Sequence, residues 1–201
     1  SVGMIVKRLF DVFMSALGLI LLSPLFLAIA AAIKWESSGP VFFRQERVGL
    51  HGKVFRIHKF RTMRVDAELM GLQITVGADL RVTLVGRLLR KYKLDELAQL
   101  LDVLVGEMSL VGPRPEVPAY VACYPADMAE IVLSVRPGIT DRASIEYKDE
   151  NDILAKSSDP LQAYIAEVLP IKIQYYVDYV RTRSFWGDVR IIIDTVFAII
   201  R

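Results

Sequence analysis

The sequence predicts a mostly helical α+β protein bound to a membrane, with a broken N-terminal helix, a small β-hairpin and a helical cytosolic domain. Three observations support this prediction: an uncharged stretch of twenty-two residues from Val12 to Ile33, two short β-prone runs after it, and apolar residues at helical spacing further on. We place the membrane element at 4–36 and the cytosolic domain at 37–201. Residues 1–3 are typical of a remnant of tag cleavage.

The uncharged stretch is long enough for a membrane helix, since about 20 apolar residues cover the hydrocarbon core. Ser23-Pro24 lies at its midpoint, and a proline removes a backbone donor and clashes with the preceding turn. We therefore expect a break there, with the Ser23 hydroxyl bonding a carbonyl that the break frees. Basic residues lie at both ends, Lys7 and Arg8 before and Lys34 after, whereas a single-pass helix has a basic excess on one side. A re-entrant helix, which enters one leaflet and returns, explains both features; a kinked transmembrane helix is the alternative.

Two β-prone runs at 41–43 and 54–57 flank the turn at 49–52 and predict a β-hairpin. Apolar periodicity and turn residues predict the helices that follow. These are 82–92, 94–104 ended by Gly106, 119–135 with a break at Pro125, 161–179 and 186–200. Residues 66–80 are predicted to form a loop with a helical start, and the acidic stretch 141–159 is predicted to face solvent.

The last predicted helix, 186–200, is strongly apolar. Such a helix packs into a core or lies as an amphipathic helix in the membrane interface. Its apolar face also suits a second copy of the chain, so a homo-oligomer is one of the partners we consider. The sequence leaves these alternatives open.

Charge is distributed unevenly along the chain. Residues 1–65 carry ten Lys and Arg against three Asp and Glu, a balance of +7, and the remainder is acidic. A basic region beside a membrane segment usually faces anionic lipid or a phosphorylated ligand, which disfavours nucleic acid as the partner. The single Cys123 excludes an internal disulfide, and with only two histidines a zinc site is not expected. These counts favour a reducing, cytosol-facing location.

The Asp95-Glu96 pair is the strongest candidate for chemistry. It opens the predicted 94–104 helix and follows Arg90, Lys91 and Lys93. A helix N-terminus stabilises a carboxylate and also receives phosphate, and an ionised Asp is a competent nucleophile toward phosphorus. Acidic residues in a first helical turn are common, however, and need no function. The pair alone leaves both interpretations open.

Several cations in stiff or turn-like sequence accompany this pair. Lys59 and Arg61 end the hairpin, Arg114 lies between Pro113 and Pro115, and Arg136 precedes a Pro-Gly turn. A fixed guanidinium is suited to clamping phosphate. Together with the membrane element, these groups suit transfer of a phosphoryl group to a membrane-bound acceptor, with Mg²⁺ bridging phosphate oxygens. The chain has no Walker or dinucleotide-binding motif, which disfavours ATP hydrolysis and dinucleotide chemistry.

These features, in this order, resemble the bacterial sugar transferases, the monotopic phosphoglycosyl transferases that begin lipid-linked glycan assembly. The matching segments span nearly the whole chain. They are Lys7-Arg8-Leu9-Phe10-Asp11, Ser23-Pro24, Gly39-Pro40-Val41-Phe42, Gln45-Glu46-Arg47-Val48-Gly49, Lys59-Phe60-Arg61-Thr62-Met63, Leu94-Asp95-Glu96-Leu97 with Gln99-Leu100, Gly112-Pro113-Arg114-Pro115 and Arg136-Pro137-Gly138-Ile139-Thr140.

The resemblance implies that a UDP-sugar gives its sugar-1-phosphate to a polyprenyl (undecaprenyl) phosphate, with release of UMP. It implies that Asp95 attacks the β-phosphorus to form a covalent phosphosugar intermediate, that Glu96 is its partner, and that Mg²⁺ is bound with Asp95 as a ligand. It further implies that the basic positions around the phosphates are Lys59, Arg61, Arg90, Arg114 with Pro115, and Arg136. The broken helix is implied to be re-entrant in the bacterial inner membrane, with both ends cytoplasmic. Residues 141–147 depart from the commonest pattern, which leaves the sugar open.

Two other functions compete with this one. A non-enzymatic, membrane-anchored adaptor that binds anionic lipid or a partner explains the apolar stretch and the basic region, but not the acidic pair or the Arg residues set among prolines. A Mg²⁺-dependent phosphatase or nuclease is disfavoured, because one acidic pair is sparse for a two-metal site.

Overall fold

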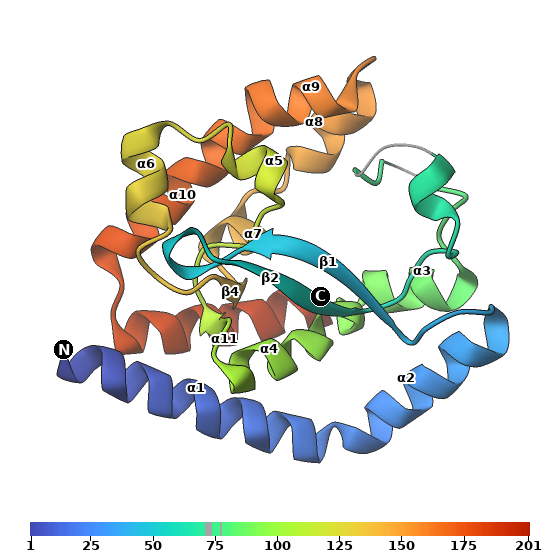
Figure 1. Ribbon diagram of the computed structural model, residues 1–201, viewed down its shortest axis with the longest axis horizontal. Coiled ribbons are helices and arrows are strands. Elements are labelled where there is room, and N and C mark those ends of the chain that lie inside the picture. The colour runs from blue at the N-terminus through green and yellow to red at the C-terminus, as the bar shows by residue number, and fades with distance from the viewer. Residues whose placement is uncertain (71–73, 77) are drawn as a thin grey trace.

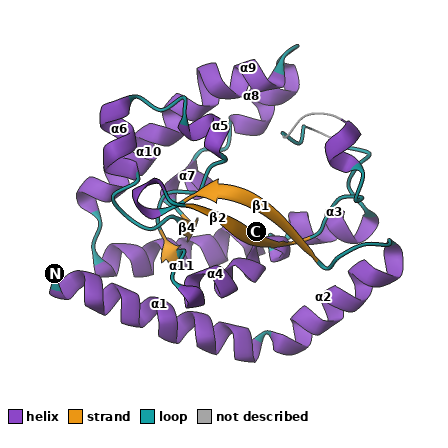
Figure 2. Cartoon of the chain, viewed as in Figure 1, coloured by secondary structure: helices purple, strands orange, loops and turns teal. Residues whose placement is uncertain are grey.

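The chain folds as a mostly helical α+β unit with a long bent helix along one side and a β-hairpin at its centre (Figures 1 and 2). A computed structural model describes residues 1–70, 74–76 and 78–201. The α-helices are α1 (Val2–Leu21), α2 (Ser23–Glu36), α3 (Leu84–Lys91), α4 (Leu100–Val105), α5 (Pro118–Val121), α6 (Ala126–Val132), α7 (Arg142–Glu146), α8 (Glu150–Lys156), α9 (Pro160–Ala163), α10 (Leu169–Thr182) and α11 (Phe185–Ile200). The strands are β1 (Phe42–Val48), β2 (Val54–Phe60), β3 (Ser109–Val111) and β4 (Gly138–Thr140). Short 3-10 turns lie at Leu50–Gly52, Ala67–Met70 and Leu94–Gln99, and a π-helical turn at Tyr164–Val168.

The break predicted at Ser23-Pro24 is confirmed. Helix α1 ends at Leu21, α2 begins at Ser23, and the two are bent by 62°. The Ser23 hydroxyl donates to the carbonyl of Ile20 at 2.7 Å, so it satisfies a group that the break leaves free. In the described part of the chain no single helix is long and apolar enough to cross a bilayer, but α1 and α2 together meet the length and composition of a span. Re-entry of this pair into one leaflet stays a prediction.

Helix α1 is fastened to the domain by the two basic residues that the sequence assigned to the membrane flank. Lys7 Nζ lies 2.5 Å from Asp188 Oδ2 of α11 and donates to the carbonyl of Val111 at 3.1 Å. Arg8 donates to the carbonyls of Leu104 and Met108. Both side chains therefore hold α1 against α4, β3 and α11.

Helix α2 packs on the centre of the molecule. Ile29 and Ile33 are buried against Phe60 of β2, Leu89 of α3 and Ala98 of the 94–99 turn. Helix α2 and the 94–99 turn are thus directly in contact.

The end of α2 is also bonded to α3. The Glu36 carboxylate accepts hydrogen bonds from the backbone N–H groups of Leu84 at 2.6 Å and Val85 at 2.7 Å, which are free donors in the first turn of α3. Thr83 caps the same turn by accepting from Gly86. Gly86 lies so close to the backbone of Thr62 that a Cβ would come within 2.1 Å of the Thr62 oxygen. These contacts fix α3 between the end of α2 and the end of β2.

The predicted hairpin is confirmed, with longer strands than expected. Strands β1 and β2 pair antiparallel, with Phe43 opposite Lys59 and Arg47 opposite Phe55. Because side chains alternate along a strand, Lys59 and Arg47 lie on the same face of the hairpin. His58, on the other face, contacts Asp102 of α4 at 2.8 Å.

A second sheet, which the sequence did not predict, joins β3 and β4 in parallel. It brings the Gly112-Pro113-Arg114-Pro115 segment beside the Arg136-Pro137-Gly138 turn. The two segments approach so closely that a Cβ on Gly138 would lie 2.0 Å from the Gly112 nitrogen, and one on Gly112 would lie 2.6 Å from the Arg136 oxygen. Glycine is required at both positions because no side chain fits.

Helices α5 to α10 form the main hydrophobic core, with α10 at its centre, while Ile191 of α11 packs with Val111 and Tyr179 in a smaller cluster. The break predicted at Pro125 is confirmed, and the predicted 94–104 helix is a 3-10 turn followed by α4. The expectation that 141–159 faces solvent is wrong in part, because Asp141, Ala143 and Leu154 are buried. In the predicted 66–80 loop, a 3-10 turn confirms the helical start, while 71–73 and 77 lie outside the described residues.

We predict that Lys7→Met lowers the free energy of unfolding by about 3 kcal/mol, because it leaves the Asp188 carboxylate buried without its cation. Thermal or denaturant unfolding in detergent micelles measures the change. Lys34→Met, at an exposed position near the end of α2, is the matched control and should be close to neutral. Equal stabilities for the two variants would contradict a fastening role for Lys7.

Candidate active site

The acidic pair lies on the Leu94–Gln99 turn, which follows α3 after a sharp reversal. Lys93 makes the reversal in the left-handed conformation, with φ of 53°, which is uncommon for a residue with a side chain. Leu94 and Ala98 pack on the α2 contact described above. This anchoring directs Asp95 and Glu96 toward β2 on the opposite side of the turn.

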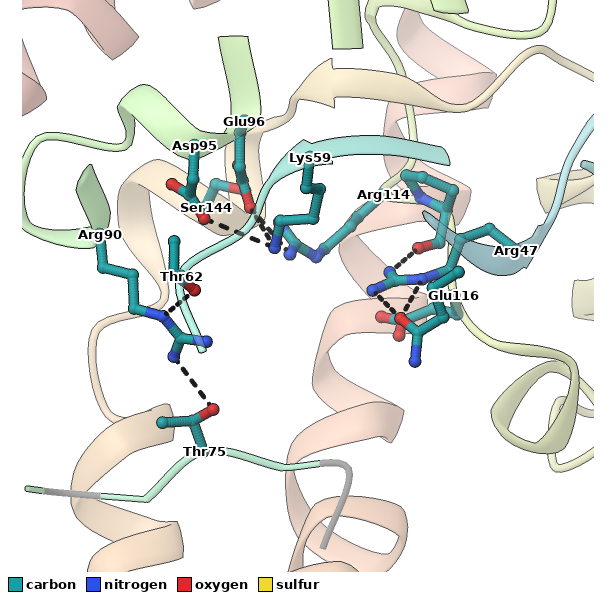
Figure 3. Close-up of polar contacts among 12 residues, drawn as sticks. Arg47, Lys59, Thr62, Thr75, Arg90, Asp95, Glu96, Arg114, Glu116 and Ser144 are labelled. Carbon is teal, nitrogen blue, oxygen red and sulfur yellow. Dashed lines mark hydrogen bonds and ion pairs between the residues drawn. The ribbon is translucent and has the colours of Figure 1, made fainter. Parts of the chain in front are cut away.

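Asp95 is buried beside an ammonium group. Asp95 is 5% exposed, and its Oδ2 lies 3.7 Å from Lys59 Nζ of β2 (Figure 3). None of the described residues donates a hydrogen bond to the Asp95 carboxylate. Burial raises the pKa of Asp95 above its usual value, and the nearby Lys59, Arg90 and Arg114 charges oppose the rise. The carboxylate therefore lies near cations, while its oxygens accept no hydrogen bond from the described residues.

Glu96 is paired more tightly than Asp95. Arg114 donates to Glu96 Oε1 at 3.0 Å, and Lys59 Nζ lies 3.7 Å from the same oxygen. Burial by itself would raise the pKa of Glu96, but Arg114 and Lys59 together outweigh it and hold the pKa at about 2. Glu96 is thus a permanent anion at neutral pH, and it fixes both the guanidinium and the ammonium group.

The Lys59 ammonium group lies between the two carboxylates. Burial lowers the pKa of Lys59, while Glu96 and Asp95 raise it and the Arg114 and Arg47 charges lower it further. Besides the two carboxylates, the positive charges of Arg114 and Arg47 lie near the Lys59 ammonium group, and an anion that binds among these cations stabilises all three. This arrangement is suited to a ligand that brings additional negative charge.

Arg90 approaches Asp95 from α3. Its Nε donates to Thr62 Oγ1 at 2.8 Å and its Nη1 donates to Thr75 Oγ1 at 3.0 Å, as Figure 3 shows. Two neutral acceptors orient the guanidinium without neutralising it. Its charge accordingly opposes the rise that burial causes in the pKa of Asp95.

Arg47 and Glu116 also belong to this cluster, and the sequence-based site did not include them. Arg47 donates to the carbonyl of Pro115 at 2.7 Å and so holds the Arg114-Pro115 backbone against β1. Glu116 is buried and accepts hydrogen bonds from Tyr164 at 2.9 Å and Tyr176 at 3.2 Å. The alternation of side chains along β1 was the sequence signal that could have identified Arg47, because it places Arg47 on the same face of the hairpin as Lys59.

Two of the expected phosphate-binding residues lie elsewhere in the described structure. Arg61 donates to the carbonyl of Pro40 at 2.7 Å and to Ser37 Oγ at 2.8 Å, which fixes the connection between α2 and β1. Arg136 donates to the carbonyl of Gly106 at 2.8 Å. Neither guanidinium contacts the acidic pair, and a phosphate-binding role for them stays a prediction.

The acidic pair fits Mg²⁺ in one of the two ways that proteins hold this ion. Across the described residues there is no group of three or more His, Cys, Asp and Glu side chains that could form a protein cage for a metal. Mg²⁺ more often uses one or two carboxylates and takes its other ligands from water and substrate phosphates. The Asp95 carboxylate, free of protein hydrogen-bond donors, suits this second mode.

Sequence comparisons identify the chain's relatives. The sequence profile of the family described as "Bacterial sugar transferase" matches residues 2–201. The chain is 42% identical over 201 residues to a Klebsiella pneumoniae protein named UDP-glucose:undecaprenyl-phosphate glucose-1-phosphate transferase, covering 98% of this chain and 40% of that protein. It is 38% identical over 197 residues to an Aeromonas hydrophila protein named UDP-N-acetylgalactosamine-undecaprenyl-phosphate N-acetylgalactosaminephosphotransferase, covering 97% of this chain and 44% of the other.

A Caulobacter vibrioides protein, named like the Klebsiella one, is 41% identical over 192 residues, which cover 94% of this chain and 68% of that protein. The chain thus spans about two fifths of the length of the first two relatives. The profile match and these identities extend over nearly every residue that builds the site, and on that ground the chain belongs to the bacterial sugar transferase family.

Proposed function

We propose that this chain transfers sugar-1-phosphate from a UDP-sugar to undecaprenyl phosphate, giving undecaprenyl diphosphate sugar and UMP. The relatives are named for this reaction with glucose or N-acetylgalactosamine. The observation that carries the proposal is the buried Asp95, 3.7 Å from Lys59 and directly beside the Glu96–Arg114 ion pair. The donor and the lipid acceptor are both anionic at their reacting ends, so a site rich in fixed cations suits both.

The proposed reaction has two displacements at the same phosphorus. In the first, an Asp95 carboxylate oxygen attacks the β-phosphorus of the UDP-sugar, the bond from that phosphorus to the bridging oxygen breaks, and UMP leaves. In the second, a phosphate oxygen of undecaprenyl phosphate attacks the phosphosugar on Asp95, and the carboxylate is released. Each step conserves charge and atoms without an oxidant or a further co-reactant.

The residues around Asp95 have separate roles in this scheme. Lys59 and Arg114 neutralise phosphoryl oxygens as charge moves onto them, and Arg90 does so from the α3 side. Glu96 keeps Arg114 in place, and Arg47 holds the backbone that carries it. Mg²⁺, when bound through Asp95, would supply further neutralisation of the diphosphate.

The contact between α2 and the 94–99 turn supports a membrane location for this chemistry. A soluble donor must meet an acceptor that is confined to lipid. The packing of Ile29 and Ile33 on Ala98 places the acidic turn directly against the bent helix pair. We propose the cytosolic face of the bacterial inner membrane as the location, with α1 and α2 as a re-entrant element.

We predict that Asp95→Asn abolishes UMP release from a UDP-sugar in the presence of undecaprenyl phosphate, because an amide is not a nucleophile toward phosphorus. Vesicle binding and thermal stability should be retained, since Asp95 makes no hydrogen bond with the described residues. Asp127→Asn, at an exposed position on α6, is the control. Turnover by Asp95→Asn at the wild-type rate would refute the proposal, and vesicle binding without UMP release by the wild type would favour the adaptor function.

The covalent route makes a separate prediction. Incubation of the wild type with a UDP-sugar and no acceptor should leave a phosphosugar mass on the peptide that contains Asp95. Steady-state kinetics should show the parallel-line pattern of a ping-pong reaction. An intersecting, ternary-complex pattern together with an unmodified peptide would contradict the two-step scheme while leaving the overall transfer intact.

The Glu96–Arg114 pair predicts non-additive effects. Glu96→Gln and Arg114→Gln should each lower kcat/KM by about 100-fold, and the double variant should lose far less than the product of the two. The reason is that each single change already removes the ion pair that positions the guanidinium. Multiplicative losses in the double-mutant cycle would show that the two side chains act independently.

A further inference from the structure

Two guanidinium groups converge on the end of α4, outside the contacts of the acidic pair. Arg8 of α1 donates to the carbonyls of Leu104 at 3.2 Å and Met108 at 3.4 Å. Arg136, which lies just before β4, donates from its Nε to the carbonyl of Gly106 at 2.8 Å. A Cβ on Gly106 would lie 3.4 Å from Arg8 Nη2. Both side chains thus reach the residue that ends α4.

These two cations are oriented by carbonyl groups but are not neutralised. Within the part of the chain that the structure describes, neither guanidinium forms an ion pair with a carboxylate. The acidic residues next along the chain are engaged elsewhere, since Asp11 accepts from Ser109 Oγ at 2.6 Å and Glu107 pairs with Lys53 at 3.2 Å. Two like charges held close together favour the binding of an anion between them.

Arg136 also has N–H groups that no described residue uses. Its Nε is bonded as above, while its two Nη groups make no hydrogen bond with the described residues. The buried side-chain atoms without a partner in the described chain belong to Tyr120, Asp141 and Tyr147. The Nη groups are not among them and are accessible to solvent. Because a planar guanidinium matches two oxygens of a phosphate group, Arg136 presents a phosphate-binding fork to the surface, beside the charge of Arg8.

Apolar side chains lie beside this pair of arginines on the surface. Leu9 on α1 and Leu104 and Val105 at the end of α4 are exposed, and α1 packs along α4 (Figure 1). Exposed apolar groups next to unpaired arginines suit the boundary between the acyl chains and the headgroups of a membrane. Free phosphate would contact the arginines alone, whereas an anionic phospholipid brings a phosphate group and acyl chains together.

We propose that Arg8 and Arg136 bind the phosphate group of an anionic phospholipid at the junction of α1 and α4. The site does not involve the cations around Asp95. A headgroup bound here fixes the N-terminal part of α1 at the depth of the lipid phosphates. The inference rests on the proposed membrane location of α1 and α2, but not on the proposed reaction.

The test measures the melting temperature of the detergent-solubilised protein while dihexanoyl phosphatidylglycerol, an anionic short-chain lipid, is added. A ligand that binds the folded state raises the melting temperature with its concentration, which gives an apparent affinity. We expect Arg136→Gln and Arg8→Gln each to lower that affinity about 10-fold, as for the loss of a charge-assisted hydrogen bond. Arg56→Gln, at an exposed position on β2, is the control and should respond like the wild type.

Dihexanoyl phosphatidylcholine and inorganic phosphate identify the ligand. The first has the same chains and a phosphate group but no net charge, and the second has no chains. Weaker effects of both on the wild type support an anionic phospholipid. An equal effect of phosphatidylcholine would show that apolar contacts alone bind the lipid, and an equal effect of inorganic phosphate would show a free-phosphate site. Either result overturns the proposal.

Equal affinities of Arg136→Gln and the wild type for phosphatidylglycerol also overturn it. The cations around Asp95 are the same in both proteins, so lipid bound there does not account for a difference. If Arg136→Gln does not fold, Arg136→Lys replaces it, because an ammonium group keeps the charge and a donor for Gly106 but has no planar fork. A lowered affinity of folded Arg136→Lys supports the proposal, and wild-type affinity overturns it.

The lipid titration separates this inference from the proposed function, because it needs no turnover. Normal UMP release by the wild type, with a lipid affinity that none of the arginine variants changes, would overturn the lipid site alone. Stabilisation by phosphatidylglycerol through Arg136, in a wild-type chain that releases no UMP, would refute the transferase proposal and leave the lipid site.

Discussion

The organisation of this molecule depends on one electrostatic constraint, the placement of two neighbouring carboxylates among cations that come from separate parts of the chain. The packing of their turn on α2 leaves Asp95 buried and Glu96 partly buried. Buried charges are tolerated only with partners, and here the hairpin supplies Lys59 while the β3–β4 sheet positions Arg114. The hairpin and the β3–β4 sheet thus place Lys59 and Arg114 beside the same turn.

The same turn connects two environments. Its apolar side, Leu94 and Ala98, packs on the bent helix pair, and its polar side faces Lys59 and Arg114. Glu36 and Thr83 fix α3 at the junction, which in turn carries Arg90 to Asp95. In the proposed reaction, the water-soluble donor and the lipid-bound acceptor therefore meet at a turn that contacts both the bent helix pair and the fixed cations.

The sequence predicted the local features well and the long-range ones only through family resemblance. The helix break, the hairpin and the end of the helix at Gly106 follow from proline, β-prone and glycine residues, whose effects are local. The β3–β4 pairing was missed because each strand has three residues and carries no periodic signal. Arg61 and Arg136 have the same charge and similar surroundings in sequence as Arg114, and only tertiary contacts show that they bind backbone carbonyls instead.

The junction between α2 and α3 limits how the N-terminal element can vary. Each residue added to an α-helix turns everything beyond it by about 100° and advances it by about 1.5 Å. The Glu36 carboxylate must stay on the first N–H groups of α3 while Ile29 and Ile33 stay on the buried side. Substitutions along the exposed side of α2 leave that geometry intact, whereas a single inserted or deleted residue rotates one contact away from the other. The structure consequently accommodates changes in the exposed residues of α2 more readily than a change in its length.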